Sequence, residues 1–482
     1  MTITIIGLGP GDPMQLTREA WARLAAAEEV YLRTERHPTV QGLPTELVLH
    51  SFDRLYDQSE SFDQLYGKIA EEVVRLGQRP QGVTYAVPGH PLVGEATVTR
   101  ILKLAEQASV PVRIVNGISF VSPILACLGV DALSGLQIAD ATELAARRHP
   151  PFSPDVPVVV GQLYNRELAS DVKLTLMNQY PDDHPVKLLY AIGTPEERIE
   201  MLPLHELDHH EVDHLTSLYV PALPRPSAFE TFQDTIARLR APDGCPWDRE
   251  QTHQSLRRNL LEEAYEALAA LDADDPNALR EELGDLLLQI VLHSQIAVEE
   301  GEFSMADVVA AIDAKIKRRH PHVFGDVQVS GVGDVIANWE AIKKNERADA
   351  KRGNGHPSAL DGVPVDLPAL TQAEAYSDRA ARMGFDWPDV DGVLDKVSEE
   401  LREIRAAGDP VERAEEFGDL LFALVNAARW LKLDPEAALR SANQKFAGRF
   451  RRVETQVQAQ SRDLKGMSLA DLDVLWESAK QS

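Results

Sequence analysis

Two acidic patterns occur twice in this sequence, as EEAYE (262–266) with EELGDLL (281–287), and again as EELRE (399–403) with EEFGDLL (415–421). Leucine, alanine and glutamate recur at helical spacing around both copies, without the alternation typical of strands. An internal repeat of this kind indicates two similar structural units. We therefore expect the second half of the chain to be all helix and to contain one unit twice.

Further landmarks follow the repeat in the same order. They are a lysine four residues before an arginine (Lys315 and Arg319, Lys445 and Arg449), a tryptophan four before a lysine (Trp339 and Lys343, Trp476 and Lys480), and a glycine three before a tryptophan (Gly244 and Trp247, Gly384 and Trp387). Trp247 and Trp387 could stack on a base. A tryptophan between a turn and a helix is more often a core anchor, and we expect both to be buried.

The repeated acidic residues have the spacing of metal ligands. Residues three and four positions apart share a helix face, so a pair of helices would gather four or five carboxylates. Asp285 and Asp419 precede strongly apolar runs, which predicts that they lie near the core. Such clusters need a compensating cation, and oxygen ligands favour Mg²⁺ or Mn²⁺. One EExxE match alone would more simply be a solvated surface, but two paired with ExxD favour metal binding. The predicted ligands are Glu263, Glu266, Glu282, Asp285, Glu400, Glu403, Glu416 and Asp419.

These motifs, with KFAGRF (445–450) and a WxxxK element (476–480), resemble the MazG family over about residues 229–482. The resemblance implies an all-α, usually homodimeric metal hydrolase that splits nucleoside triphosphates into monophosphate and pyrophosphate. The positions that match its metal-binding and water-activating residues in the second repeat are Glu399, Glu400, Glu403, Glu416 and Asp419. The positions that match its substrate-binding residues are Lys396, Lys445, Arg449, Trp476 and Lys480. The alternative explanation for these cations is that they lie near helix ends, where the helix dipole stabilises positive charge.

One position separates the two copies. Asn259 stands three residues before EEAYE, where Lys396 stands three before EELRE. The first repeat therefore lacks one cation that could face a phosphate. We expect the second repeat to carry most of the catalysis.

The first 220 residues alternate short apolar runs with amphipathic stretches, which is typical of an α/β domain. Strands are expected at 2–6, 83–87, 112–115, 156–160 and 186–192. Three prolines within 220–228, and a Gly-, Pro- and Asp-rich stretch at 348–368, predict breaks. The predicted domains are 1–222 (α/β), 229–345 (first helical repeat) and 367–482 (second helical repeat).

Glycine-containing loops follow three of the expected strands, at 7–12, 88–91 and 116–119, which suggests a ligand cleft at the edge of an open sheet. With IGTPEERIE (192–200), these segments resemble the tetrapyrrole (precorrin-type) methylase fold over about residues 1–220. The resemblance implies two α/β subdomains with S-adenosylmethionine bound between them. His90 stands where the family commonly has aspartate, which leaves methyl transfer open. The predicted cofactor-binding residues are Gly9, Gly11, Pro88, Gly89, His90, Gly117 and Ser119.

The composition limits the choice of partners and compartment. A net charge of −27 argues against nucleic-acid binding, and no apolar stretch is long enough to cross a membrane. Two cysteines, Cys127 and Cys245, are too few for a disulfide framework, so we expect a reducing cytoplasm. A histidine-rich segment could bind zinc, but its acidic neighbours favour a solvated segment. It contains His205, His209, His210 and His214.

Three functional hypotheses remain on the sequence alone. The first is a Mg²⁺-dependent nucleoside triphosphate pyrophosphohydrolase. The second is an S-adenosylmethionine-dependent methyltransferase whose helical half serves dimerisation or regulation, and the third is a metal-binding scaffold without catalysis. Inward carboxylates paired with recurring cations favour the first, because a dimerisation module needs apolar helix faces and no acidic cluster.

Overall fold

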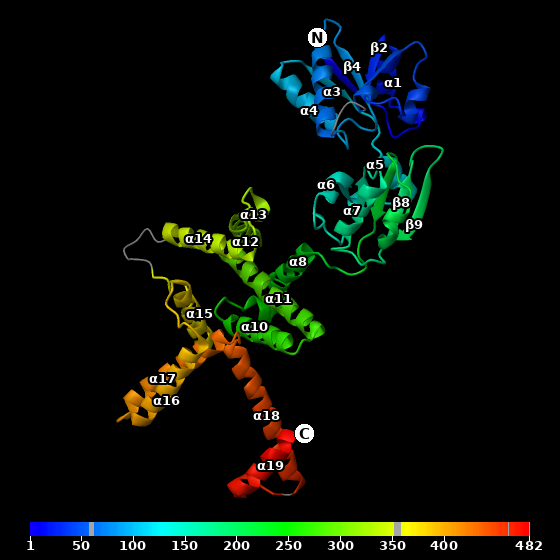
Figure 1. The fold of residues 1–482 in the computed structure, drawn as a ribbon. Helices are drawn as coiled ribbons and strands as arrows, with labels where there is room; N and C mark the ends of the chain where they lie inside the picture. The colour runs from blue at the N-terminus through cyan, green and yellow to red at the C-terminus, as the bar shows by residue number, and fades with distance from the viewer. Residues whose placement is uncertain (57–61, 351–357, 461, 482) are drawn as a thin grey trace. The chain divides into compact units, whose positions relative to one another are not determined.

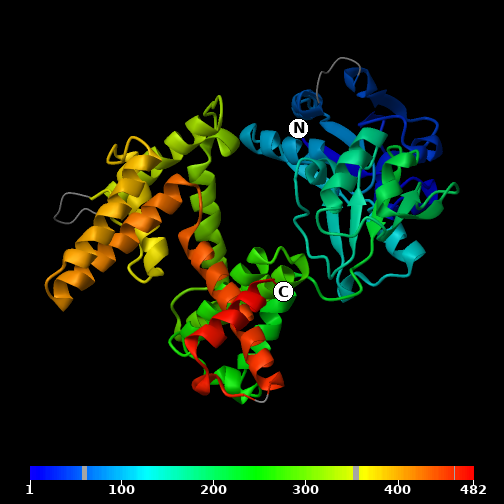
Figure 2. The ribbon, with the colours of Figure 1, turned by 60° about the horizontal axis from the view of Figure 1, so that its bottom comes forward.

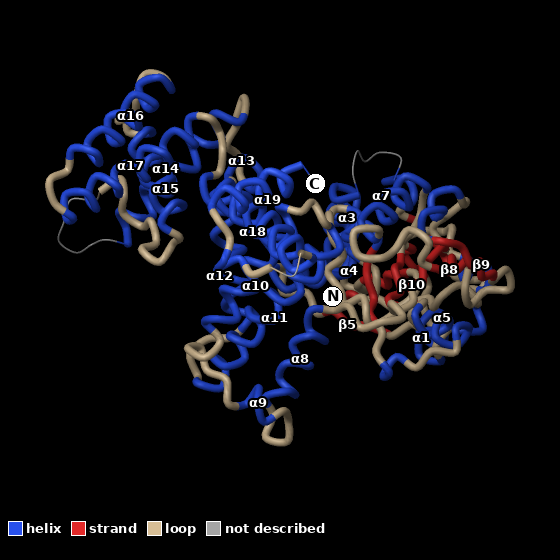
Figure 3. The backbone as a smooth tube through the Cα atoms, turned by 90° about the horizontal axis from the view of Figure 1, so that it is seen from below, coloured by secondary structure: helices blue, strands red, loops and turns tan. Residues whose placement is uncertain are grey.

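The chain forms two compact units, Met1–Glu250 and Gln251–Ser482, in a computed structural model that describes residues 1–56, 62–350, 358–460 and 462–481. Within the described residues, every strand belongs to the first unit, and beyond Val220 only helices, turns and loops occur (Figure 3). The prediction of an α/β front half followed by helical repeats is confirmed. The limits predicted for the three domains stay predictions.

A parallel sheet opens the first unit, with the strand order β3-β2-β4-β1-β5. Its strands are β1 (Ile3–Gly7), β2 (Glu29–Leu32), β3 (Val48–Ser51), β4 (Val83–Val87) and β5 (Val112–Val115). Its helices are α1 (Arg18–Ala25), α2 (Asp53–Tyr56), α3 (Phe62–Gly77) and α4 (Ala96–Gln107). Helices α3 and α4 pack on one face of the sheet and α1 packs on the other (Figure 1). Central strands covered on both faces explain the continuous apolar runs in the sequence.

A second sheet, mixed in direction, follows with the order β6-β7-β10-β8-β9. Its strands are β6 (Gln137–Asp140), β7 (Val158–Gly161), β8 (Pro185–Tyr190), β9 (Arg198–Pro203) and β10 (Thr216–Val220). The helices of this subdomain are α5 (Val121–Leu128), α6 (Ala141–Ala145) and α7 (Arg166–Leu176). Short 3-10 helices are η1 (Pro13–Gln15), η2 (Pro38–Gly42), η3 (Ala132–Ser134) and η4 (Leu204–His209). Val158, Val160, Leu188 and Leu218 belong to its main core.

The first unit continues through α8 (Phe229–Arg240) and α9 (Pro246–Arg249). The carboxylate of Asp155 accepts hydrogen bonds from the backbone N–H groups of Ser227 (2.6 Å) and Ala228 (3.1 Å), and so holds the start of α8. Trp247, on the short α9, is 58% exposed, so the prediction that it anchors a core is wrong for this chain. The predicted core position Trp387 is half-buried.

The second unit repeats one helical arrangement. The first copy consists of α10 (Arg257–Asp272), α11 (Pro276–Glu300), α12 (Met305–Arg319), α13 (Pro321–Phe324) and α14 (Val332–Ala350). The second consists of α15 (Ala369–Arg382), α16 (Val390–Ala406), α17 (Pro410–Trp430), α18 (Pro435–Ala459), η5 (Leu464–Gly466) and α19 (Leu469–Gln481). The sequence landmarks place α10 with α16, α11 with α17, α12 with α18 and α14 with α19.

Each repeat contains a helix hairpin with the same turn chemistry. Asp275 caps the N-terminus of α11 and Pro276 follows at its first position, as Asp409 and Pro410 do for α17. A capping carboxylate accepts hydrogen bonds from the first free N–H groups, and proline has none to lose. The helices α16 and α17 run side by side (Figures 1 and 2).

Two further sequence expectations can be compared with the helices. Part of the break predicted at 348–368, residues 351–357, lies outside the described residues; residues 358–368 contain neither helix nor strand. None of the helices in the described ranges has the length and hydrophobicity that crossing a membrane requires.

Candidate active site

The first carboxylate cluster lies between α10 and α11. Glu263 and Glu266 come from α10 and Glu282 from α11, and one oxygen of each lies within 4.8 Å of the others. Desolvation, followed by the charge of Asp285, raises the pKa of Glu263, and desolvation and Glu266 raise that of Glu282. The side chains that the sequence pattern assigned to one face therefore do meet, and their mutual repulsion favours binding of a cation.

The second cluster lies between α16 and α17 and is built around a buried glutamate. Glu400 is 3% exposed, and one of its oxygens lies within 4.8 Å of oxygens of Glu416 and Asp419. The Oε2 atom of Glu400 is buried and has no hydrogen-bond partner among the described residues. Desolvation and the charge of Glu403 raise the pKa of Glu416. A buried carboxylate oxygen without a partner is costly, so these donors fit a divalent cation.

Asp419 does not occupy the position expected for it. The apolar run that follows it predicted a place near the core, but Asp419 is exposed, as are Phe417, Leu421 and Phe422. Helices α15 and α16 pack on α17 and still leave part of its surface open, so an apolar run does not bury every residue beside it. Asp285, its counterpart in the first repeat, is half-buried.

Lys396 makes the second cluster electrostatically different from the first. Its Nζ lies 2.7 Å from Oε1 of Glu400 and 3.1 Å from Oε1 of Glu399. Hydrogen bonds to Glu400 and then Glu399 raise the pKa of Lys396, so the ammonium is firmly charged. In the first repeat the equivalent residue is Asn259, which carries no charge. Only the second cluster thus has a protein cation at this position.

The other predicted substrate-binding residues lie on α18 and α19. The ring centre of Trp476 lies 5.2 Å from that of Phe446, and Lys480 forms an ion pair with Glu477. In the parts of the chain that the structure describes, no hydrogen bond or ion pair joins Lys445, Arg449 or Lys480 to the α16–α17 carboxylates. The structure thus brings Lys396 to the cluster and leaves the other assigned roles as predictions.

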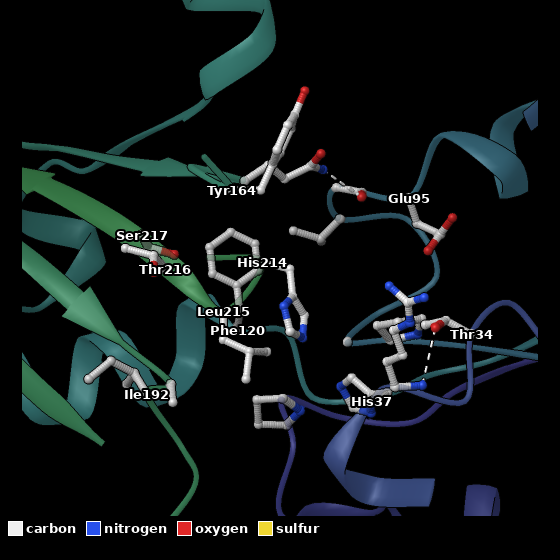
Figure 4. Close-up of a pocket in the computed structure, with 18 of the residues that line it drawn as sticks. Thr34, His37, Glu95, Phe120, Tyr164, Ile192, His214, Leu215, Thr216 and Ser217 are labelled. Atoms are coloured by element: carbon white, nitrogen blue, oxygen red, sulfur yellow. Dashed lines mark hydrogen bonds between the residues drawn. The ribbon is translucent and has the colours of Figure 1, made fainter. Parts of the chain in front are cut away.

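The first unit contains a cavity of about 450 Å³ between its two subdomains (Figure 4). Arg33, His37 and Glu95 line it from the parallel sheet, and Tyr164 and His214 line it from the mixed sheet. Arg33 forms an ion pair with Glu95 at 3.3 Å. The size suits a nucleoside-sized ligand, and both subdomains contribute polar groups to the wall.

His37 is the most perturbed group in this cavity. It is 6% exposed, and burial, followed by the charges of His214 and Arg33, lowers its pKa to about 4. The ring is therefore neutral at physiological pH. Its Nδ1 is buried and has no hydrogen-bond partner within the described residues. His37 lines the cavity, so a neutral imidazole rather than a cation contributes to its wall.

The glycine loops at the strand ends pack on one another. Gly9 and Gly89 exchange backbone hydrogen bonds of 3.2 and 2.8 Å, and a Cβ on Gly117 would lie 2.2 Å from the carbonyl oxygen of Gly89. Pro88 and Gly89 line the cavity; the other predicted cofactor-binding residues do not line it. Those others are Gly9, Gly11, His90, Gly117 and Ser119. From the sequence, we expected these glycines to allow close approach of a ligand. In the structure, glycine is required at position 117 because the backbone of Gly89 comes close to it.

Comparisons with known proteins give a family match for each half of the chain. A family described as "MazG nucleotide pyrophosphohydrolase domain" matches residues 251–324, and one described as "Tetrapyrrole (Corrin/Porphyrin) Methylases" matches residues 2–208. The "Nucleoside triphosphate pyrophosphohydrolase/pyrophosphatase MazG" of Thermotoga maritima is 44% identical over 252 residues, 52% of this chain and 95% of the relative. The chain belongs to the MazG family. It is therefore an enzyme of the nucleotide pyrophosphohydrolase class, with a methylase-like domain in front of the MazG repeats.

Two further comparisons extend to the front half of the chain. The "Uncharacterized protein YabN" of Bacillus subtilis is 42% identical over 495 residues, covering 100% of this chain and 98% of the relative. A solved structure of uroporphyrin-III-C-methyltransferase from Thermus thermophilus is similar with a TM-score of 0.35 and 20% identity, covering 46% of this chain and 91% of that one. The combination of a methylase-like domain with MazG repeats therefore also occurs in a relative of the same length.

The histidines of the histidine-rich segment have different surroundings in the structure. His205 lies 3.0 Å from the carbonyl oxygen of Asp182, and His210 lies 3.2 Å from the carboxylate of Glu200. His214 lines the cavity instead. Among the described residues, these histidines are in none of the groups that could hold a metal ion.

Sequence reasoning missed most of the cavity wall. Arg33 and His37 follow β2, a short strand that the apolar pattern did not reveal, and Tyr164 follows β7. These residues come from separate loops that share no motif or spacing. The one available signal was the histidine-rich segment, where His214 was considered for another role.

Proposed function

We propose that the MazG repeats hydrolyse nucleoside triphosphates to the monophosphate and pyrophosphate in a reaction that requires Mg²⁺ or Mn²⁺, mainly in the second repeat. The observation that supports this proposal is the cluster of Glu400, Glu416 and Asp419, with a buried oxygen of Glu400 that lacks a partner. Glu403 and Glu399 flank this cluster. Divalent ions bound there would neutralise the triphosphate and polarise its phosphoryl oxygens.

The residues of the chain supply orientation and proton transfer. A carboxylate of the cluster accepts the proton of the attacking water as the bond between the α- and β-phosphoryl groups breaks. Lys396, which pairs with Glu399 and Glu400 in the absence of substrate, would donate charge-assisted hydrogen bonds to phosphate oxygens when divalent ions compensate these carboxylates. Lys445, Arg449, Trp476 and Lys480 remain candidates for the rest of the substrate site.

Product analysis tests this proposal directly. The pure full-length protein is incubated with Mg²⁺ and a panel of nucleoside triphosphates. The products are then separated and their molar amounts are measured. We expect monophosphate and pyrophosphate in equal amounts, and no turnover with a chelator present. Diphosphate and orthophosphate as the main products would refute the proposal.

A second activity is proposed for the front domain, where S-adenosylmethionine would bind in the cavity bordered by Pro88 and Gly89. The size of the cavity and its polar lining residues, among them Arg33, Glu95 and Tyr164, favour a polar ligand of this kind. Calorimetry with millimolar S-adenosylmethionine is the test, with His37→Ala as the variant expected to bind more weakly. No heat of binding with the intact protein would count against the proposal.

We also propose that the chain acts as a homodimer in the cytoplasm, without nucleic-acid or membrane partners. Large apolar side chains on the hairpin helices, such as Leu283, Leu287, Phe417 and Phe422, are exposed in the single chain. A second copy would cover such faces. Sedimentation at several concentrations measures the mass, and a monomer at all of them would contradict the proposed dimer.

A further inference from the structure

A second group of metal-ligating side chains lies at the other end of the α10–α11 hairpin from the first carboxylate cluster. One nitrogen of His253 and one carboxylate oxygen from each of Glu300 and Glu302 lie within 4.8 Å of one another. Glu282 and Glu300 are 18 residues apart on α11, a rise of about 27 Å. This group is therefore separate from the carboxylate cluster that Glu282 joins.

The imidazole of His253 is held in place by a second histidine. Its Nδ1 lies 2.7 Å from Nδ1 of His293, and the two ring planes are 6° apart with centres 5.0 Å apart. That separation equals the hydrogen bond plus two ring radii, so the rings lie edge to edge in one plane. The Nε2 atom of His253 consequently points away from His293, and it lies 4.0 Å from Oε2 of Glu300.

The surrounding backbone also fixes the group. His253 lies in a turn where Thr252 and Ser255 bond to each other, each side-chain oxygen accepting from the other residue's N–H at 2.9 and 3.1 Å. Glu300 is the last residue of α11, and Gly301 ends that helix with φ 74°. This reversal brings Glu302 back beside Glu300. Three ligands from two chain segments thus converge without any change of backbone.

We propose that His253, Glu300 and Glu302 form a binding site for Zn²⁺ that joins the end of α11 to the turn before α10. One imidazole and two carboxylates, with room for water, suit zinc better than magnesium, which prefers oxygen ligands alone. A histidine that binds a metal normally donates its other ring N–H to an acceptor. With zinc bound, Nδ1–H of His253 would donate to Nδ1 of His293, 2.7 Å away, and the lone pair on Nε2 of His253 would bind the ion.

This proton arrangement has a definite consequence for His293. With Nδ1 of His293 accepting, its own proton lies on Nε2, a buried atom that has no hydrogen-bond partner among the described residues. Without zinc, the opposite arrangement avoids a buried N–H without an acceptor, because the shared proton then belongs to His293. Zinc binding therefore changes each of the two neutral rings to its other tautomer and releases no proton to solvent.

Titration of the full-length protein with Zn²⁺ in a large excess of Mg²⁺ tests the site, because Mg²⁺ fills clusters that contain only oxygen ligands. We expect one Zn²⁺ per chain by calorimetry and a higher midpoint of thermal unfolding. His253→Ala and Glu302→Gln should each abolish this binding. His293→Phe should weaken it by about 10–100-fold, since it removes the group that orients the ligand.

The matched control is Glu299→Gln, which removes a charge from the same helix end without removing a proposed ligand. It should keep the zinc site. Glu302 is exposed beyond the helix end, so Glu302→Gln tests the site even if His253→Ala disturbs the turn. Absence of zinc binding, or binding that survives both ligand variants, would overturn the proposal whatever the outcome of the product analysis.

Discussion

The two carboxylate clusters come from the same motif but balance their charge differently. In the second, Lys396 pairs with buried Glu400. In the first, Asn259 supplies no charge. Raised pKa values occur in both clusters, at Glu263 and Glu282 in the first and at Glu416 in the second. The comparison teaches that one lysine can replace part of the charge that a divalent ion supplies. The two repeats should therefore differ in their demand for metal and in their affinity for a triphosphate.

The largest expected difference between the repeats is in turnover. Glu416→Ala or Asp419→Ala removes a ligand and leaves its neighbours as uncompensated like charges. We expect kcat/KM for pyrophosphate release to fall by roughly 100-fold or more, as is typical for groups that stabilise transition-state charge. Glu282→Ala and Asp285→Ala should cost much less.

The control for this comparison is Glu415→Ala, which removes an exposed acidic residue next to Glu416 that is outside the cluster. It should leave turnover nearly unchanged. Active second-repeat variants beside inactive first-repeat variants would mean that the working site lies in the other half. Equal losses from both repeats would indicate two coupled sites.

Smaller effects, on KM and on Mn²⁺ affinity, are expected when Lys396 and Asn259 are each replaced by the residue of the other repeat. Lys396→Asn should raise KM for the triphosphate roughly tenfold, because one charge-assisted hydrogen bond to phosphate is lost. Without substrate it should bind Mn²⁺ more tightly, since Glu400 loses its protein cation. Asn259→Lys should weaken Mn²⁺ binding at the first cluster, as measured by calorimetry.

Lys465→Asn, at an exposed lysine outside both hairpins, is the control for the exchange and should change neither KM nor Mn²⁺ affinity. If Lys396→Asn leaves both quantities unchanged, the asymmetry has no basis in this residue. Loss of secondary structure in the variant is checked separately by circular dichroism.

The smallest expected effect is on stability without metal. The pKa of Glu416 is raised above its ordinary value of 4.5, so the folded state holds this proton more tightly than the unfolded state does. Its contribution to stability is fully present below pH 4.5 and is lost as the pH rises through the folded pKa. With a chelator, Glu416→Gln should therefore unfold at a higher temperature than the parent at pH 8.

At pH 4.5 the difference between the two proteins should nearly vanish, and added Mg²⁺ should reverse it at pH 8 because the variant has lost a ligand. Equal unfolding midpoints for parent and variant throughout this pH range would show that the cluster carries no repulsion.

The fold was predictable where one physical pattern dominates. The strands Val83–Val87 and Val112–Val115 agree with their predicted limits, since both are mostly apolar and begin and end on valine. The strands Glu29–Leu32 and Val48–Ser51 were missed because each is only four residues long and mixes polar with apolar side chains. Helical periodicity likewise brought out both hairpins, because it recurs over several turns.

The candidate sites were predictable only in part. Carboxylates that share a helix face, such as Glu263 and Glu266, follow from spacing alone. The burial of Glu400 on α16 and the exposure of Asp419 on α17 do not, because they depend on which faces of the two helices are covered by neighbouring helices. The zinc ligand His253 and its partner His293 are 40 residues apart, a separation that becomes a contact only through the antiparallel hairpin.

The meeting of backbone at Gly7, Gly89 and Gly117 bears on how this domain can evolve. A Cβ on Gly7 or Gly117 would come within 2.6 Å or less of neighbouring main chain, so mutation at these points is closed off. The cavity wall, in contrast, is made of side chains from independent loops, including Arg33 and His214. We therefore expect new ligand preferences to arise by exchange of wall residues one at a time, while the close-packed glycines preserve the scaffold that presents them.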